Sequence, residues 1–313
     1  TRSPTVTGVQ TCALPIYVIT KKKAGRPDAR RAVPSDCRSK DARIVFAAIC
    51  MLLFALHTRA QCLPSTLPIN HGETVNYDIY FKWGLLMSRA GEAALSFGKA
   101  TYQGQSASRY RLLFRTVKLF ESIYRMRDTM DCYYAPDYSL LFSSKHTHEN
   151  HYHLMDELTF SYPDRRTSIR SHRYTPTETK IDTTLIVRSG CAFDMLGATF
   201  FLRTLDRKKL KTGDAFPMTV AIGKDLVKIS CRYQGQAVVE RGNIKYRTLH
   251  FSVDIYDKAF TQTKAAAELW IGDDDNFIPV KIRSKLKIGY AEVHYRNASG
   301  LKAPLHCRIE TKR

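Results

Sequence analysis

The feature that most constrains this chain is a long series of short segments in which β-branched and aromatic residues alternate with polar ones. The series begins at Thr74 and is broken by Gly, Pro, Asn and Asp, as expected for strands joined by turns. So many strands at this spacing favour a barrel or a strongly curled sheet, because closure removes exposed strand edges. We expect strands at residues 75–83, 90–97, 109–116, 124–134, 140–148, 151–161, 167–174, 184–188, 215–222, 227–233, 246–255, 265–271, 278–288 and 291–295.

One segment departs from this period-two pattern. In residues 193–205, Phe193, Leu196, Phe200 and Phe201 recur at helical spacing, and basic residues and a glycine follow. The spacing predicts an amphipathic helix of about three turns, either a core element or a lid, lying across the concave face of the sheet. The predicted fold class is therefore mainly all-β: a curled antiparallel sheet or partly open β-barrel with one helix across its concave face.

The N-terminal residues have the charge order of a secretory signal. A basic stretch precedes the apolar run 44–56, which is 13 residues long and falls short of the roughly 20 that a membrane-spanning helix needs. Thr58 and Ala60 are the small residues expected before a signal-peptidase cut after Ala60. We therefore expect an exported bacterial protein, periplasmic or outer-membrane-associated, with no integral membrane span after cleavage.

This interpretation divides the chain into three parts. Residues 1–16 are expected to be an artefact or disordered, since positions 6–16 back-translate to a common sequencing-adapter oligonucleotide. Residues 17–60 form the basic region and signal peptide, and residues 61–313 form a single β-rich domain. Acylation of Cys62 as a lipoprotein is disfavoured by the residues before it.

The mature part remains distinctly basic. The first 60 residues hold 11 of the 49 Lys and Arg and 3 of the 29 Asp and Glu, which leaves a formal net charge of +12. The electrostatic field of such a positive charge favours binding to anionic surfaces such as phospholipid or lipopolysaccharide head groups. Export argues against nucleic acid as the partner. The alternation of Lys281, Arg283 and Lys285 is also what the solvated face of a strand would show.

The mature part has five cysteines, an odd number without a C-x-x-C motif. An oxidising compartment permits one or two disulfides, and at least one cysteine must be free or paired between chains. The spacing does not select partners among Cys62, Cys132, Cys191, Cys231 and Cys307.

Several short motifs recur in an order that resembles a known family. They are Tyr77–Gly84, Ala90–Ala94, Arg127–Asp128, Glu149–Asn150 with Tyr152, Phe193–Asp194 with Phe201–Arg203, Trp270–Asp274 and Ile278–Val280. Together they resemble the bacterial exported family catalogued as domain of unknown function 3108. The resemblance spans most of residues 70–290 and implies a periplasmic or surface location and a curled antiparallel sheet. It supplies no catalytic residues to carry over.

A histidine-rich segment is the sharpest local feature. In an extended chain His146 and His148 share one face, while Glu149, His151 and His153 share the other. Either face could supply ligands to zinc or copper, which would support a metal-dependent hydrolase or metal-binding protein. The alternative is a hairpin whose turn lies at or near Glu149 and Asn150, with exposed imidazoles.

Other chemistry is weakly supported. We find no convincing Gly-x-Ser-x-Gly, Ser-x-x-Lys or phosphate-binding glycine motif, so no catalytic residue is assigned. The segment Gly272–Asn276 is interpreted as a turn, because it lacks the spacing of a calcium-binding loop.

The working hypothesis is a non-catalytic cell-envelope protein that binds a lipid-like or other apolar ligand in a groove of the curled sheet. A structural module that binds an envelope protein or a glycan is a further alternative. No cofactor is expected outside the zinc alternative. The predicted groove residues are Trp83, Phe193, Leu196, Phe200, Phe201 and Trp270.

Overall fold

The structure, a computed structural model, describes residues 67–256, 263–286 and 289–309. The predicted signal segment, the cut after Ala60 and Cys62 lie outside these residues. The described strands are β1 (Glu73–Trp83), β2 (Leu86–Tyr102), β3 (Gln105–Thr116), β4 (Arg127–Tyr134), β5 (Leu140–Glu149), β6 (Tyr152–Ser161), β7 (Thr167–Tyr174), β8 (Thr179–Val187), β9 (Ala192–Phe193), β10 (Ala215–Ile222), β11 (Asp225–Arg241), β12 (Ile244–Tyr256), β13 (Thr263–Gly272), β14 (Pro279–Lys285), β15 (Tyr290–Ser299) and β16 (Arg308–Ile309). The helical elements are α2 (Lys118–Glu121), the 3-10 turn η1 (Pro163–Arg165) and α3 (Met195–Arg203).

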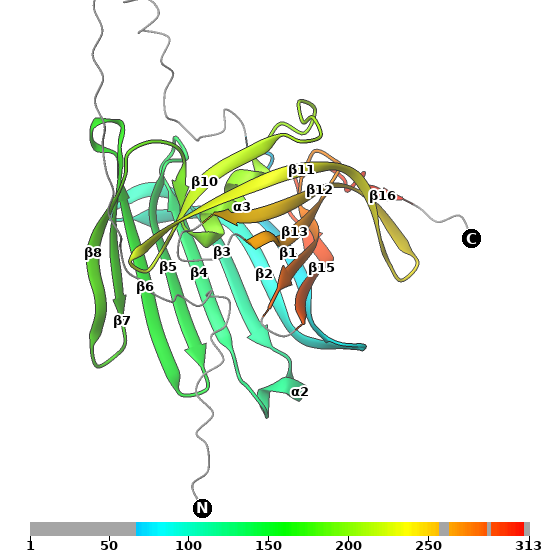
Figure 1. Cartoon of the computed structure of the whole chain (residues 1–313), viewed down its shortest axis with the longest axis horizontal. Coiled ribbons are helices and arrows are strands. Elements are labelled where there is room, and N and C mark those ends of the chain that lie inside the picture. Colours follow the sequence, from blue (N-terminus) through cyan, green and yellow to red (C-terminus); the bar gives the residue numbers. More distant parts are fainter. Residues whose placement is uncertain (1–66, 257–262, 287–288, 310–313) are drawn as a thin grey trace, which may run out of the picture.

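All the described strands belong to one sheet, which curls around α3 (Figure 1). Its order is β8-β7-β6-β5-β4-β3-β2-β1-β15-β14-β13-β12-β11-β10-β9, and β16 adds to β12. Two antiparallel meanders are thus joined where β1 pairs with β15. The short parallel pair of β9 with β10 ends the series, so β8 and β9 are the two edges of an incompletely closed barrel. The predicted fold class is confirmed.

The alternation of apolar and polar residues in the sequence gives the sheet one buried face and one more exposed face. In β2, Gly91, Ala93, Leu95 and Phe97 are buried, while the residues between them are partly exposed. Residues directly opposite one another on neighbouring antiparallel strands share a face. We call the face that contacts α3 the inner face and the opposite one the outer face.

Helix α3 packs against the inner face. The ring of Phe200 stacks on Tyr134 at 4.3 Å between centroids and lies 5.1 Å from Tyr110 and 5.6 Å from Phe97, so it touches β2, β3 and β4 at once. At the start of the helix, the Asp194 side chain accepts hydrogen bonds from the backbone N–H groups of Gly197 at 2.7 Å and Leu196 at 3.3 Å. This cap satisfies two N–H groups that have no partner within the helix.

The end of α3 is held by a buried ion pair. Arg203 is fully buried and donates to both carboxylate oxygens of Glu73 on β1, at 2.5 and 3.2 Å. It also donates to the carbonyl oxygens of Asn276 at 2.9 Å and Phe277 at 3.3 Å, in the loop between β13 and β14. Because a buried charge is tolerated only when it is paired and hydrogen-bonded, these contacts fix the helix relative to both meanders.

The hairpin of β11 and β12 runs beyond the main sheet. A register shift between Tyr233 and Gly235, where Gly235 has φ of 119°, bends β11. Past this point the hairpin builds a second, small core with β14 and the C-terminal segment, formed by Val239, Tyr246, Val280 and Cys307.

Candidate functional site

The residues predicted to line a groove separate into two places. Phe193, Leu196 and Phe200 are buried around α3, and Phe201 is partly buried with its ring 5.2 Å from that of Phe193. These four come together as part of the main core. The part of the inner face that surrounds α3 is therefore filled by the protein's own side chains.

Trp270 lies elsewhere, on the outer face. Its neighbours in β13, Leu269 and Ile271, are the buried inner residues, so the alternation turns the indole outwards. The indole stacks on His250 at 4.7 Å, and the Lys281 ammonium lies 5.2 Å from the ring centroid. The side chain of Trp83 lies outside the described part of the structure.

A second part of the inner face extends beyond α3 along β1–β7. Tyr110 contacts α3 through Phe200, and Cys132 on the neighbouring strand donates through Sγ to Asp194 at 3.1 Å. Leu112 and Met130 lie two residues further along these strands, opposite each other, and so share the same face. At this position Leu112 and Met130 are only partly buried.

We call this second part the accessible inner face. Across the neighbouring strands, Met130 lies opposite Lys145, Lys145 opposite Asp156, and Asp156 opposite Arg173. Two residues further along the strands, Phe114 lies opposite Asp128, and Thr147 lies opposite Leu154. It comprises the apolar residues Ile79, Leu112, Phe114, Met130 and Leu154 and the charged residues Asp128, Lys145, Asp156 and Arg173.

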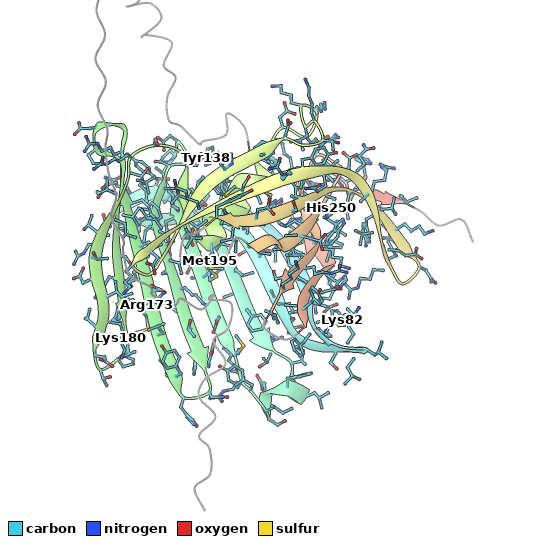
Figure 2. The ribbon with its side chains drawn as sticks, in the orientation of Figure 1. Lys82, Tyr138, Arg173, Lys180, Met195 and His250 are labelled. Carbon is cyan, nitrogen blue, oxygen red and sulfur yellow. The ribbon has the colours of Figure 1, made fainter. Side chains whose placement is uncertain are left out.

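The apolar part of this face is in contact with the core yet open to solvent. Ile79, Leu112, Phe114 and Met130 pack against the main core but remain partly exposed. Phe114 lies against the backbone of Gly91, where a Cβ atom would meet its ring at 2.9 Å, so only glycine admits the ring here. Met195, the first residue of α3 and labelled in Figure 2, is 41% exposed.

The charged part of this face is organised around two carboxylates. Arg173 donates to Asp156 Oδ2 from both Nε, at 2.8 Å, and Nη2. The other oxygen, Asp156 Oδ1, is buried and has no hydrogen-bond partner among the described residues. The turn between β10 and β11 approaches the same arginine, since a Cβ atom on Gly223 would lie 3.0 Å from Arg173 Nη1.

Asp128 is the second carboxylate. It accepts from the backbone N–H of His148 at 3.0 Å, and the Lys145 ammonium lies 4.0 Å from its other oxygen. Burial raises the pKa of Asp128, against the opposing effects of that hydrogen bond and of Lys145. Nearby, the Tyr124 hydroxyl donates to the buried Glu149 carboxylate. The accessible inner face therefore joins an apolar surface to polar groups that can bond a ligand.

The histidine-rich segment forms the hairpin of β5 and β6. The turn lies between Glu149 and Tyr152, with Asn150 at φ of 50°, as in the hairpin alternative. Because of this turn His153 pairs with His148, and their rings lie 4.1 Å apart, so these two share a face rather than opposite ones.

The remaining predicted ligands are distributed around this hairpin. His146 lies on the same face as His148, Glu149 lies on the opposite face with Tyr124, and His151 is exposed in the turn. Partial desolvation and the charge of His153 lower the pKa of His148. Within the described ranges, no three His, Cys, Asp or Glu side chains are grouped closely enough to hold a metal ion. The zinc alternative stays a prediction from the sequence.

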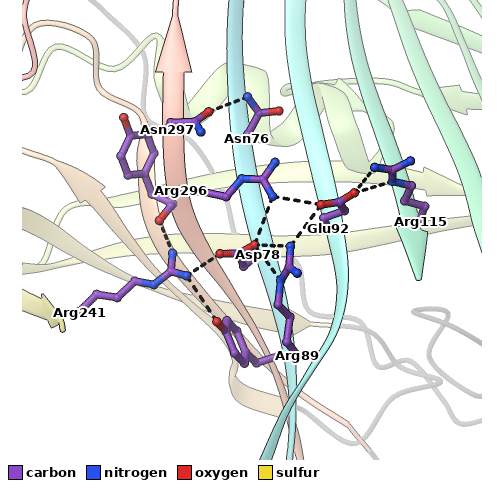
Figure 3. A network of polar contacts seen from close by, with 10 residues as sticks. Asn76, Asp78, Arg89, Glu92, Arg115, Arg241, Arg296 and Asn297 are labelled. Atoms are coloured by element: carbon purple, nitrogen blue, oxygen red, sulfur yellow. Dashed lines mark hydrogen bonds and ion pairs between the residues drawn. The ribbon is translucent and has the colours of Figure 1, made fainter. Parts of the chain in front are cut away.

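A network of arginines and carboxylates covers the outer face of β1, β2 and β15 (Figure 3). Asp78 pairs with Arg89 at 2.8 Å, with Arg241 at 2.5 Å and with Arg296 at 3.5 Å. Burial alone would raise the pKa of Asp78, but the hydrogen bonds from Arg241 and Arg89 hold that pKa below its usual range. Because Arg241 belongs to the β11–β12 hairpin, this network attaches the hairpin to the sheet.

The described thiols do not form a nucleophilic site. Cys132, Cys231 and Cys307 are free and buried, and burial raises the pKa of each thiol, to about 12 for Cys231. Cys191 takes part in a disulfide.

The fold and this face define a class of β-protein: an incomplete antiparallel barrel with an internal helix and a partly exposed inner face. The chain belongs to the family described as protein of unknown function (DUF3108), whose model matches residues 76–295. The family suggested by the sequence motifs is thus confirmed. A comparison with curated proteins finds no match.

Two solved structures are similar in outline. One is a beta-barrel-like protein of domain of unknown function DUF1849 from Brucella abortus, at 9% identity and a TM-score of 0.49, covering 72% of this chain and 96% of that one. The other is a putative exported protein with a YmcC-like fold from Bacteroides fragilis, at 9% identity and a TM-score of 0.29, covering 75% of this chain and 99% of that one.

Among the described residues, none of the helices has the length and apolar character needed to cross a membrane.

Proposed function

We propose that this protein is a non-catalytic binding protein of the bacterial cell envelope that holds a lipid-like ligand on its accessible inner face. The observation that carries the proposal is the partial exposure of Leu112, Phe114 and Met130 on the concave side of the sheet, where side chains of this kind are normally covered. An acyl chain laid along these residues would remove their apolar surface from water.

The charged residues of the same face define the polar end of the ligand. Asp156 Oδ1 is buried and has no partner in the described part of the chain, so it can accept a hydrogen bond. Lys145 and Arg173 neutralise the neighbouring carboxylates, which reduces the attraction for a purely cationic ligand. We therefore expect an acyl ligand whose polar end carries a hydrogen-bond donor, such as a hydroxyl or an amide.

Export to the envelope is part of this proposal. Its support is the signal-like pattern before Gln61 and the disulfide at Cys191, since disulfides persist in oxidising compartments. The non-catalytic character is supported by the buried thiols with raised pKa and by the sequence analysis, which assigned no catalytic residue.

The test compares two adjacent leucines of β3 that point to opposite faces. Leu112 faces inwards, whereas Leu113 is 45% exposed on the outer face. A fluorescent fatty-acid amide, whose polar end donates hydrogen bonds, would be titrated into the wild type, Leu112→Lys and Leu113→Lys, with circular dichroism and thermal unfolding as folding controls. A lysine in an apolar site loses the burial of a leucine, about 1.5–3 kcal/mol, so Leu112→Lys should weaken binding at least about tenfold.

Native mass spectrometry of the protein extracted mildly from envelopes adds an independent result. We expect a bound species of lipid mass, which Leu112→Lys removes and Leu113→Lys retains. A protein that carries no lipid and does not bind the probe would refute the proposal. So would an equal loss of probe binding in both variants.

A further inference from the structure

One end of the sheet carries a concentration of exposed apolar side chains. We call the part of this end that is formed by the β1–β2 turn, the end of β14, the start of β15, the α2 loop and the β5–β6 turn the lower rim; it lies towards the lower edge of Figure 1. Of the 14 large apolar residues that are exposed in the described structure, eight lie here, so their distribution is uneven. They are Leu85, Leu86, Met87, Leu119, Ile123, Tyr152, Leu286 and Tyr290.

The strand pairing brings these residues to the same end. The β1–β2 turn follows the pair of Trp83 with Leu86, and Lys82 pairs with Tyr290 at the start of β15. The loop with α2 is joined to β2 by the hydrogen bond from the N–H of Val117 to the carbonyl oxygen of Ala90, at 3.0 Å.

The β5–β6 turn completes the rim. It is joined to the α2 loop by the bond from the N–H of Asn150 to the carbonyl oxygen of Arg125, at 2.8 Å. Four neighbouring connections at this end of the sheet therefore carry exposed apolar residues.

The degree of exposure at the tips is high. Leu85 is 103% exposed, Leu119 79% and Ile123 77%, so these side chains make almost no contact with their own fold. Exposed apolar groups in such number mark a surface that meets another phase or another molecule. Their positions on several separate turns suit insertion into a fluid layer, where each turn can enter independently.

The lower rim carries more basic than acidic residues, which favours an anionic partner. Its described residues include Lys82, Lys118, Arg125, Arg127 and Lys285, against the carboxylates Glu121, Asp128 and Glu149. Arg89 is not counted, because Asp78 and Glu92 already pair with it. Glu121 pairs with Arg127 at 3.1 Å, and Glu149 is buried against Tyr124. Within the described part of the chain, no ion pair engages Lys82, Lys118 or Arg125.

We propose that the lower rim docks on an anionic phospholipid bilayer. Leu85, Leu86 and the α2 loop insert among the head groups, while Lys118 and Arg125 contact the phosphates. Apolar burial combined with attraction of basic residues to anionic lipid is the usual basis of reversible membrane association. The docking does not depend on a ligand at the accessible inner face, whose residues lie on other positions of the strands.

Vesicle flotation tests the proposal with the exported protein. Vesicles of phosphatidylcholine alone and mixed with phosphatidylglycerol are compared at low and high salt. We expect binding only to the mixed vesicles, and weaker binding at high salt because the charges are exposed. An L85S/L86S double variant should bind at least about tenfold more weakly, from the lost burial of two leucines.

Variants of two basic residues and one matched control variant are tested in the same flotation assay. Lys118→Ala and Arg125→Ala should each weaken binding about fivefold, since a basic residue near an anionic surface contributes about 1 kcal/mol. Val238→Ser is the control, because Val238 is 60% exposed but lies on β11 away from the lower rim. All these side chains are exposed, so the variants should fold, as thermal unfolding will verify.

The outcomes are decisive in both directions. Selective loss in the variants of the lower rim, with Val238→Ser unchanged, supports docking by this end of the protein. Equal binding of all variants, or equal loss in Val238→Ser, overturns it. Failure of the wild type to bind mixed vesicles also overturns it, and leaves the fatty-acid test of the inner face unaffected.

Discussion

Replacing Arg203 with methionine should weaken the fold by several kcal/mol, because Glu73 would lose its partner in the core. Both side chains are almost completely buried, at 0% and 2% exposure. Besides the ion pair, the guanidinium satisfies the carbonyl oxygens of Asn276 and Phe277. Methionine retains much of the apolar volume but none of these bonds. Removing one member of a buried pair costs about 3–5 kcal/mol.

The assay is equilibrium unfolding in guanidinium chloride, followed by circular dichroism. For a domain of this size the slope m should be about 5 kcal/mol per molar denaturant, so the midpoint should fall by about 0.6–1 M. Arg207→Met is the matched control, because Arg207 pairs with Asp273 and Asp275 near the surface. Its loss should cost less than about 1 kcal/mol.

A double variant separates the buried charge from the packing. In Glu73→Leu with Arg203→Met neither member of the ion pair is left without its partner, so we expect at least about 2 kcal/mol of the single-variant loss to be recovered. The reasoning is refuted if Arg203→Met has the wild-type midpoint. It is also refuted if the double variant is as unstable as the single one, since the loss would then come from packing.

Three further predictions follow from other contacts. Burial alone would raise the pKa of Glu292, but hydrogen bonds from Arg283 and His294 and the charge of Lys281 lower it to about 2. Because this folded-state pKa lies below the ordinary value of 4.5, a stabilisation of about 3 kcal/mol is present above about pH 4.5 and is lost as the pH falls towards 2. Glu292→Gln should flatten the pH dependence of the unfolding free energy in that window, and an unchanged profile would contradict this. Phe200→Ala should open a cavity between α3 and β2–β4, cost about 3–5 kcal/mol and lower the midpoint of thermal unfolding by roughly 10 °C. A shift of less than a few degrees would mean that the ring is not the central packing element. Peptide mapping without reduction should find Cys191 only in a linked peptide, and recovery of its free thiol would disagree with the structure.

The sequence predicted the secondary structure well because alternation and turn residues are local signals. The predicted strands 167–174 and 215–222 coincide with β7 and β10, and the predicted helix 193–205 contains α3. The end of β11 was missed: the prediction stopped at 233, before Gly235, whereas the strand bends there and continues to Arg241. A glycine in a strand pattern can mark a bulge as well as an end, and the sequence alone does not distinguish them.

The candidate site was harder to predict because it depends on register. Lys145, Asp156 and Arg173 lie on three strands and become neighbours only through the pairing of β5, β6 and β7. A shift of one residue would have turned each of them to the outer face. The same reason explains Trp270, which the sequence grouped with the α3 residues by its apolar character although its strand position directs it outwards.

The arrangement of α3 explains how one sheet can be both stable and open. The helix is capped by Asp194 at its start and tied by Arg203 at its end, so both ends are fixed by polar contacts that would be costly to break. Packing of Phe200 then fills only the part of the inner face under the helix. Stability therefore resides in the filled part, and the partly exposed Met130 beyond it can adapt to a ligand without displacing the helix. Ligand exchange on the accessible inner face should accordingly leave hydrogen-exchange protection of the α3 amides unchanged, while the amides of β3–β6 become more protected when the ligand binds.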